Sequence, residues 1–285
     1  MAAVPSLNTG ATAGWRARLT LGFARRAART VLVRREHEGP LRVQKALYPE
    51  GDAVCHALLL HPPSGIVGGD LLAIDLALDS GAHALLTTPG ATKWYRSAGD
   101  TAHQRVHATL AAGARLEWLP QENILFDGSL ATQSLSVELA ADACFLGAEV
   151  LCLGRRASGE RFASGRFGMS TRITRQGRPL WHEWGTLHGG SPFLDSPVGL
   201  RGSPVSATLL LAGLDDPLAR ALVQQLRATV AASPAWAVSA LPGVLVARWL
   251  GDGTEAARAW VVACWQVLRP AALGRDAAIP RIWHT

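Results

Sequence analysis

Residues Leu71–Thr88 read LLAIDLALDSGAHALLTT and set the pattern for most of the chain. In Leu71–Asp79 apolar residues alternate with small or polar ones, which is the period of a strand with one buried face. Asp79-Ser80-Gly81 is a turn sequence, because glycine accepts a positive φ and the Asp and Ser side chains bond to nearby backbone. A second apolar segment, Ala82–Thr88, follows at once. The stretch therefore predicts two strands joined by a tight turn.

The same alternation extends in both directions, through residues 17–24, 30–36, 101–110, 114–120, 132–139 and 166–176. Turn sequences separate these segments at Ala112-Gly113, Asp127-Gly128 and Gln176-Gly177. Short strands at regular spacing predict a mostly β protein whose body is a mostly antiparallel sandwich, barrel or stack of sheets. The segment Ala141–Gly154 is ambiguous and allows a helical turn at its start. We find no internal repeat in the sequence.

The last third of the chain changes from strand spacing to helix spacing. Residues 215–232 have Asp before Pro and then apolar residues at helical intervals, and residues 252–274 begin with cap chemistry at Asp252 or Thr254 and end at Pro270 and Gly274. A strand, Gly243–Leu250, lies between them. We expect a loose tail over residues 1–14, a β body over 15–200 and a helix-containing portion over 201–285 packed on that body.

Composition limits the classes of function. The net charge is +6, but the arginines are spread along the chain instead of clustered, so we expect no nucleic-acid binding. No apolar run approaches the roughly 20 residues of a membrane span, so we expect no membrane insertion. The four cysteines show no paired spacing and lie in apolar sequence, which predicts buried free thiols. Without a signal-peptide core, the chain is expected in the cytoplasm.

No single motif carries catalysis or tight metal binding. His103 and His107 would share one strand face with Arg105 between them, and a cation there opposes a metal site. Histidines 56, 61 and 83 come from different strands and could converge, but nothing in the sequence requires it. Carboxylates such as Glu122, Asp127 and Glu160 could form the acid and base pair of a glycosidase. Asp and Glu occur in this sequence only as often as on an ordinary protein surface, so the signal is not specific. The glycines of SGIVGGD lack the Gly-Lys-Ser/Thr of a phosphate loop.

Four stretches taken together resemble one family, the urease accessory proteins of the UreD (also called UreH) type. They are HPPSGIVGGD at 61–70, TTPGATKWYRS at 87–97, LEWLPQENILFDGS at 116–129 and LGRRASGERF at 153–162. All four occur in the family's order. Ser64 stands where that family commonly has Gly, and Trp94 where it commonly has Phe.

The resemblance implies a non-enzymatic assembly factor that is mostly β, with stacked antiparallel β-sheets of β-helix-like form and about two α-helices in the C-terminal third. It implies UreF-type and UreG-type partners, the latter supplying GTP hydrolysis, with nickel arriving from a UreE-type metallochaperone and passing into apo-urease. Nickel would be handled transiently, without a permanent cofactor or metal site. The candidate passage or partner-contact residues in the matching stretches and beside them are His61, Asp70, Lys93, Tyr95, Arg96, Glu122, Glu149, Arg155 and Glu160.

Two further interpretations stay open at this level. One is a carbohydrate-active hydrolase on a β scaffold, with carboxylates such as Glu122 and Glu160 as its acid and base. The other is a nucleic-acid binder driven by arginine. If ATKWYR, in the second of the four stretches, is a strand, one cation falls on each of its faces. We therefore expect at least one of Asp70, Glu122, Glu149 and Glu160 to pair with Lys93, Arg96 or Arg155 and to help line a hydrated route.

Overall fold

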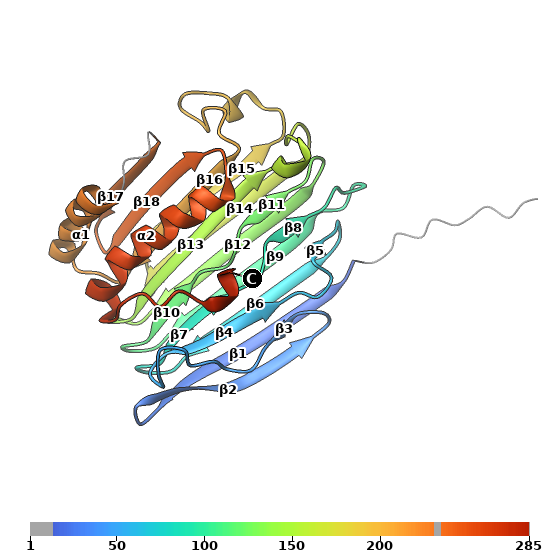
Figure 1. Ribbon diagram of the computed structural model, residues 1–285. Helices are drawn as coiled ribbons and strands as arrows, with labels where there is room; N and C mark the ends of the chain where they lie inside the picture. Colours follow the sequence, from blue (N-terminus) through green and yellow to red (C-terminus); the bar gives the residue numbers. More distant parts are fainter. Residues whose placement is uncertain (1–13, 231–234, 285) are drawn as a thin grey trace, which may run out of the picture.

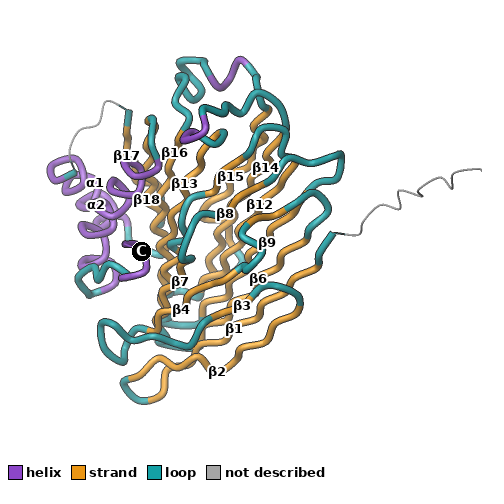
Figure 2. Tube along the Cα trace, turned by 45° about the vertical axis from the view of Figure 1, so that its right-hand side comes forward, coloured by secondary structure: helices purple, strands orange, loops and turns teal. Residues whose placement is uncertain are grey.

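Two β-sheets face each other in the computed structural model, which describes residues 14–230 and 235–284 (Figures 1 and 2). The expected loose tail therefore lies almost entirely outside the described residues. The first sheet has seven strands, in the order β15 (Arg178–His188), β14 (Arg166–Arg175), β12 (Leu130–Leu139), β9 (Ala102–Leu110), β6 (Leu71–Leu78), β1 (Arg16–Arg26) and β2 (Arg29–Glu38).

The second sheet has eleven strands. Its main path runs β17 (Trp236–Leu241), β18 (Val244–Gly251), β16 (Val205–Ala212), β13 (Cys144–Leu153), β10 (Arg115–Trp118), β7 (His83–Thr87), β4 (Cys55–Leu60) and β3 (Arg42–Val43). Three short strands continue it beyond the main path: β5 (Gly65–Ile66), β8 (Thr92–Trp94) and β11 (Asn123–Leu125). The ambiguous segment at 141–154 is thus a strand.

Within the body of each sheet the strands are parallel, which corrects the expectation of antiparallel pairing. β1, β6, β9, β12 and β14 pair in parallel in the first sheet, as do β4, β7, β10 and β13 in the second. The chain alternates between the sheets, so each turn brings it back in the same direction beside its previous strand. The mostly β prediction is confirmed, and the stack is a solenoid of about four turns. Antiparallel pairs occur at its ends, at β1–β2, β3–β4, β14–β15 and β13–β16–β18–β17.

The corners of the solenoid contain the repeat that we did not find in the sequence. Ala82, Ala114 and Ala143 are each fully buried at successive corners, immediately before β7, β10 and β13. The N–H of Arg115 donates to the carbonyl of Ala82, and the N–H of Cys144 donates to that of Ala114. The underlying segments SGAHALLT, AGARLEWL and ADACFLGA share only a small residue, an alanine and an apolar run. These shared features allow the backbones of successive turns to stack, but the sequence similarity is too weak to identify a repeat.

Proline interrupts three adjacent strands of the second sheet at the same level. Pro62, Pro89 and Pro120 lie between β4 and β5, β7 and β8, and β10 and β11. Proline has no N–H for the ladder, so the sheet breaks there and resumes after a short loop. β13 is continuous and pairs with β10 along its first half and with β11 along its second.

Two α-helices, both expected, cover the outer face of the second sheet. In α1 (Asp216–Thr229) the Asp215 side chain caps the helix by accepting a hydrogen bond from the N–H of Leu218. In α2 (Thr254–Leu273) the N-cap is Gly253 without a side-chain cap, and the helix continues past Pro270 to a left-handed Gly274. The expected cap at Asp252 or Thr254 is therefore wrong, and Pro270 does not end the helix, whereas the expected end at Gly274 is confirmed. Three 3-10 turns complete the elements, at Arg156–Ser158, Pro192–Leu194 and Arg281–His284.

The strand faces divide the apolar residues into two cores. Alternate residues of β13 face opposite ways, so Phe145 and Leu151 contact the first sheet while Leu146 and Val150 pack under the helices. All four cysteines are buried free thiols, as expected. No helix in the described part of the chain is long and apolar enough to cross a membrane.

Candidate functional site: a polar cavity between the sheets

The four sequence stretches singled out above become neighbouring strands. β5, β8, β11 and the end of β13 run side by side, with Gly65 opposite Lys93, Lys93 opposite Ile124, and Ile124 opposite Cys152. Residues from distant parts of the chain are therefore gathered at one end of the second sheet. Most of their polar side chains are used there to connect loops.

Asp70 and the residues around Glu160 are such connections. Asp70 is 2% exposed and accepts hydrogen bonds from the N–H groups of Trp15 and Val67, at 2.8 and 3.0 Å, which ties the start of β1 to the turn before β6. Arg155 donates to Glu160 at 2.6 Å, which confirms the expected pairing of an acid with one of the motif cations. The hydrogen bonds from Arg155 and from backbone N–H groups lower the pKa of Glu160 to about 2, against a smaller effect of burial.

The remaining motif residues lie nearby in varied surroundings. Arg96 pairs at 3.0 Å with Asp127, an acid outside the expected four, and Asp127 also accepts from the backbone of Ser164. Tyr95 packs edge-on against Phe126. Lys93 has no ion pair among the described residues, and two buried atoms, Nε2 of His61 and Oε2 of Glu122, have no hydrogen-bond partner there. Burial lowers the pKa of His61.

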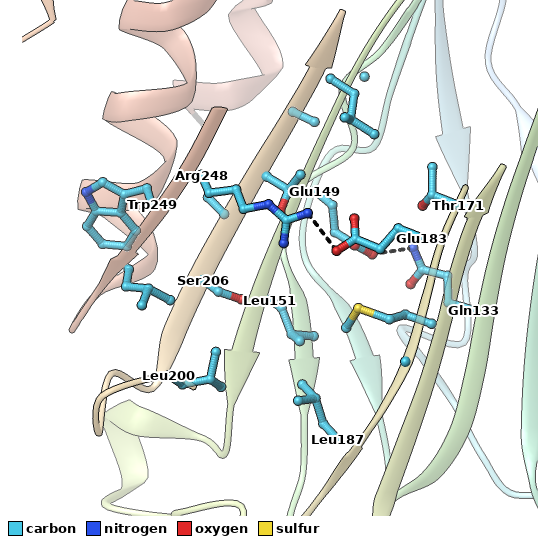
Figure 3. Close-up of a pocket in the computed structure, with 18 of the residues that line it drawn as sticks. Gln133, Glu149, Leu151, Thr171, Glu183, Leu187, Leu200, Ser206, Arg248 and Trp249 are labelled. Carbon is cyan, nitrogen blue, oxygen red and sulfur yellow. Dashed lines mark hydrogen bonds and ion pairs between the residues drawn. The ribbon is translucent and has the colours of Figure 1, made fainter. Parts of the chain in front are cut away.

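Only Glu149 of the nine candidates reaches the large cavity that opens between the two sheets (Figure 3). The cavity has a volume of about 650 Å³. Its polar lining consists chiefly of two pairs: Glu149 accepts a hydrogen bond from Gln133 at 2.7 Å, and Arg248 donates to Glu183 at 2.7 Å. Apolar residues such as Leu151, Met169 and Leu187 line the walls around them.

Glu149 is held in an environment that disfavours its charge. Its side chain touches the cavity but lies deep between the sheets, so burial raises the pKa of Glu149 to about 7, repulsion from Glu183 adds to the increase, and the hydrogen bond from Gln133 opposes it. Near neutral pH this carboxyl is therefore present in both protonation states.

Sequence reasoning missed Gln133, Glu183 and Arg248. The sequence did contain an indication of Gln133, because it lies on the same face of its strand as the buried Ala131 and Val137. Arg248 likewise shares the parity of Val246, which packs between the sheets. A polar residue at a core-facing position needs a partner across the sheets, and two such pairs meet here. The partner strands could not be identified without the parallel register.

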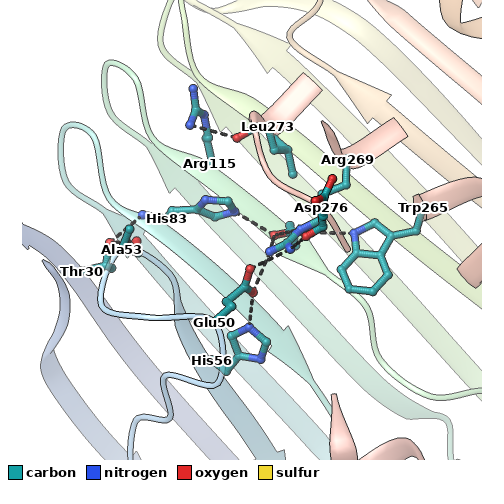
Figure 4. A network of polar contacts seen from close by, with 11 residues as sticks. Thr30, Glu50, Ala53, His56, His83, Arg115, Trp265, Arg269, Leu273 and Asp276 are labelled. Carbon is teal, nitrogen blue, oxygen red and sulfur yellow. Dashed lines mark hydrogen bonds and ion pairs between the residues drawn. The ribbon is translucent and has the colours of Figure 1, made fainter. Parts of the chain in front are cut away.

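A second polar cluster lies on the other face of the second sheet, beneath α2 (Figure 4). Arg269 is fully buried and donates to Glu117 at 2.9 Å and to Glu50 at 2.7 Å. His83 bonds to Glu117 at 2.8 Å and His56 to Glu50 at 2.6 Å, while Trp265 donates to Glu117 at 2.7 Å. Every member has a charged or polar partner inside the cluster. The cluster therefore anchors α2 to the sheet, and His61 is not part of it.

In the part of the chain that the structure describes, no group of three or more His, Cys, Asp or Glu side chains is placed so that it could hold a metal ion. His103 and His107 lie on β9 at the outer face of the first sheet, with Arg105 between them, as expected. His103 is bonded instead to Thr132, at 2.6 Å.

These features define a class of protein: a β-solenoid scaffold whose polar residues connect its turns and line a cavity between its sheets. Comparison with known proteins gives the family. Residues 15–284 match the family described as UreD urease accessory protein. The chain is 55% identical over 273 residues to the urease accessory protein UreD of Dechloromonas aromatica and 53% identical over 272 residues to that of Azoarcus sp., with 95% of each chain covered in both cases.

A third relative, the urease accessory protein UreD of Pseudomonas fluorescens, is 49% identical over 286 residues, with 99% of both chains covered. The chain belongs to the UreD urease accessory protein family. It is a non-catalytic accessory protein that takes part in urease maturation, in association with the maturation machinery. The hydrolase and nucleic-acid interpretations are set aside by this membership.

Proposed function

We propose that this chain is the scaffold subunit of an accessory complex that inserts nickel into apo-urease, and that the cavity between its sheets is a passage for the ion. The partners would be a UreF-type protein, a UreG-type GTPase that supplies GTP hydrolysis, and the urease apoprotein, with a UreE-type metallochaperone delivering nickel to the complex. The cytoplasm is the compartment in which such a complex would work. Nickel would pass through without a permanent site.

One observation carries the passage: two carboxylates, Glu149 and Glu183, face the same interior cavity from opposite sheets. Glu149 is deeply placed and Glu183 is about a third exposed, with 32% of its side-chain surface accessible, so both carboxylates can be reached from the cavity. Negative charge attracts a divalent cation, and the cation of Arg248 beside Glu183 limits how tightly an ion can be retained. A hydrated route of this kind favours transit over storage.

The remaining candidates fit a different part of the proposal. His61, Asp70, Lys93, Tyr95, Arg96, Glu122, Arg155 and Glu160 cluster at the end of the second sheet, where they shape loops that partners could contact. Asp70 and Glu160 are already saturated by hydrogen bonds within the chain. We assign these two to structure, and the passage to Glu149 and Glu183.

The test compares acid-to-amide variants inside and outside the cavity. Glu149→Gln and Glu183→Gln keep volume and most hydrogen bonding but remove charge. We expect both to copurify with the accessory partners like the wild type, and the urease matured with them to contain at least threefold less nickel and to show correspondingly lower activity. Glu138→Gln, on the outer face of β12, is the matched control and should mature urease normally.

If urease matured with either cavity variant contained its full amount of nickel, the proposal that the cavity is a passage would be wrong. Loss of complex formation wherever loading fails would also remove it, because the carboxylates would then serve assembly. Failure of the wild-type chain itself to support nickel insertion would remove the wider proposal of a maturation scaffold.

A further inference from the structure

Among the described residues five strands lie at the edges of the two sheets; β5 is only two residues long, and three of the other four carry features that prevent further strand pairing. β2 presents Arg29, Arg34, Arg35, Glu36, His37 and Glu38, β15 contains Pro179 and several titratable residues, and β3 is only two residues long. Charge, proline and shortness are the usual protections of a free edge. The fourth edge, β17 (Trp236–Leu241), has six residues with neither charge nor proline.

The backbone of β17 has groups that point away from its one neighbour. The N–H of Leu250 donates to the carbonyl of Ala235, and in an antiparallel ladder every second residue is bonded to the neighbour. The peptide groups of Trp236, Val238 and Ala240 therefore face the open side. Arg227 of α1 donates to the Val238 carbonyl at 3.1 Å, which agrees with this orientation.

A shallow groove of about 500 Å³ runs between this edge and α1, which lies beside β17 in Figure 1. Ser239 and Ala240 form one side, and Arg220, Gln224 and Arg227 form the other. These three helix residues are exposed and lie four and three positions apart, so they share one face of α1. Neither arginine has an ion pair among the described residues, so the groove wall is cationic.

The start of β17 also borders the cavity between the sheets. Ala235, Trp236 and Ala237 line its mouth, together with the exposed Trp184 of β15 on the opposite side. A strand added to β17 would lengthen the second sheet by one strand at that mouth. It would extend the wall of the passage on one side and occupy the cationic groove on the other.

We propose that the open edge of β17 is a docking site for an extended acidic segment of a partner protein in the maturation complex, which adds as a further strand beside α1. Arg227 exchanges its bond to the Val238 carbonyl for a carboxylate of the segment. Main-chain hydrogen bonds to β17 then supply the affinity, and carboxylates facing Arg220 and Arg227 supply the specificity. This inference rests on the proposed function, because it takes the partner from the maturation complex and makes the added strand part of the passage wall.

Ala240→Pro is the decisive variant. Proline removes the outward N–H at this position, and an edge strand tolerates proline where its N–H faces outward. We expect Ala240→Pro to keep the melting temperature of the wild type within a few degrees and to bind the accessory partners at least tenfold more weakly. Ala240→Thr keeps the N–H and is the matched control, and it should bind like the wild type. Arg220→Glu should weaken binding severalfold.

Hydrogen–deuterium exchange locates the contact directly. In the assembled complex the amides of Val238 and Ala240 should exchange at least tenfold more slowly than in the chain alone. If the complex matures urease while these amides stay unprotected, the docking site is wrong. It is also wrong if Ala240→Pro binds the partners with unchanged affinity. Either result leaves the proposed function intact. A dimer of this chain alone that Ala240→Pro abolishes would overturn the choice of a partner segment in favour of a second copy.

A synthetic probe separates the docking site from the proposed function. The alternating peptide acetyl-Glu-Val-Glu-Val-Glu-Val-amide should bind the wild-type chain alone and lose that binding in Ala240→Pro, whereas its Lys-Val counterpart should not bind. If the chain fails to assemble with the accessory partners, the proposed function is lost and this peptide alone decides the docking site. Equal binding of both peptides, or of neither, would overturn it.

Discussion

At the scale of single residues, the cluster around Arg269 shows how charge is kept inside this fold. Glu117 and Arg269 are completely buried, and breaking such a pair by removing one partner costs about 3–5 kcal/mol because a charge is left uncompensated. The cluster connects α2 to β4, β7, β10 and the loop that carries Glu50. Its members therefore fix where the helix sits on the sheet.

This cluster makes stability depend on pH in a definite direction. Although burial favours the neutral form, hydrogen bonds from His56 and Arg269 lower the pKa of Glu50 to about 2. A lowered pKa in the folded state contributes stability that is present above the unfolded pKa and is lost as pH falls through the folded one. We expect the free energy of unfolding to decline between about pH 4.5 and pH 2. Glu50→Gln should lose about 3 kcal/mol at pH 7 and decline less steeply, as measured by urea titration at each pH.

The exposed Glu38 provides the control, because Glu38→Gln removes a carboxylate at the end of β2 without touching the cluster. A parallel pH profile for wild type and Glu50→Gln would contradict the assignment of this acid to the stability of α2.

The environment of a single residue could be predicted from the sequence where it depends on neighbouring residues in the chain. The buried thiols and the exposed face of β9 followed from apolar context and strand parity. The partners of Glu149 and Arg269 were not predictable. Gln133 is 16 residues from Glu149, and Glu117 is 152 residues from Arg269, so both contacts depend on how the turns stack.

At the scale of elements, glycines with a positive φ decide where loops can close against strands. Gly154 follows β13 with φ +84°, and a Cβ there would lie 2.4 Å from the carbonyl oxygen of Glu160. Gly159, in the same loop, has φ +70° but no atom within 4 Å of its would-be Cβ. The two positions therefore share backbone strain and differ in contact.

We expect Gly154→Ala to destabilise the protein by several kcal/mol, because the backbone of the 154–160 loop must move, whereas Gly159→Ala should cost only about 1–2 kcal/mol for its left-handed conformation. Thermal unfolding of both variants measures the difference. Equal melting temperatures would show that the loop adjusts freely and that Gly154 does not set its position.

Element types were more predictable than their ends. The two helices and the strand between them were expected from spacing alone, and the alternating segments became β1, β2, β6, β9, β10, β12 and β14. The end of α2 at Gly274 was expected correctly, whereas its start was not, because the N-cap is Gly253 and not Asp252 or Thr254. Pro270 is accommodated within the last turn, where one missing hydrogen bond affects only the frayed end.

At the scale of the whole molecule, period-two patterning specifies sheets but not their direction. A half-buried strand has the same alternation in parallel and antiparallel sheets, and the turn sequences that suggested hairpins instead form corners between the two sheets. The distinguishing signal was the buried alanine that recurs at 82, 114 and 143, which fits stacked corners. Three short segments are too few for a period to stand out from composition.

The final prediction concerns the apolar surface around the mouth of the cavity. Trp184, Phe193 and Val198 line this mouth and are 75%, 48% and 91% exposed. Contiguous exposed apolar side chains of this size mark surfaces that associate with other proteins or with themselves. The chain expressed alone should therefore self-associate, and coexpression with its maturation partners should raise its soluble yield.

Replacing the largest of these side chains tests the cause. Trp184→Ser should at least double the soluble fraction of the chain expressed alone and lower its apparent mass in light scattering. Val33→Ser on β2, where the side chain is 45% exposed and far from the mouth in the strand order, should change neither. If both variants behave alike, or if the wild-type chain is monomeric at high concentration without partners, the surface around the mouth is not what limits solubility. Because Trp184 lines the cavity, a loss of partner binding in the same variant would place one of the partner interfaces at its mouth.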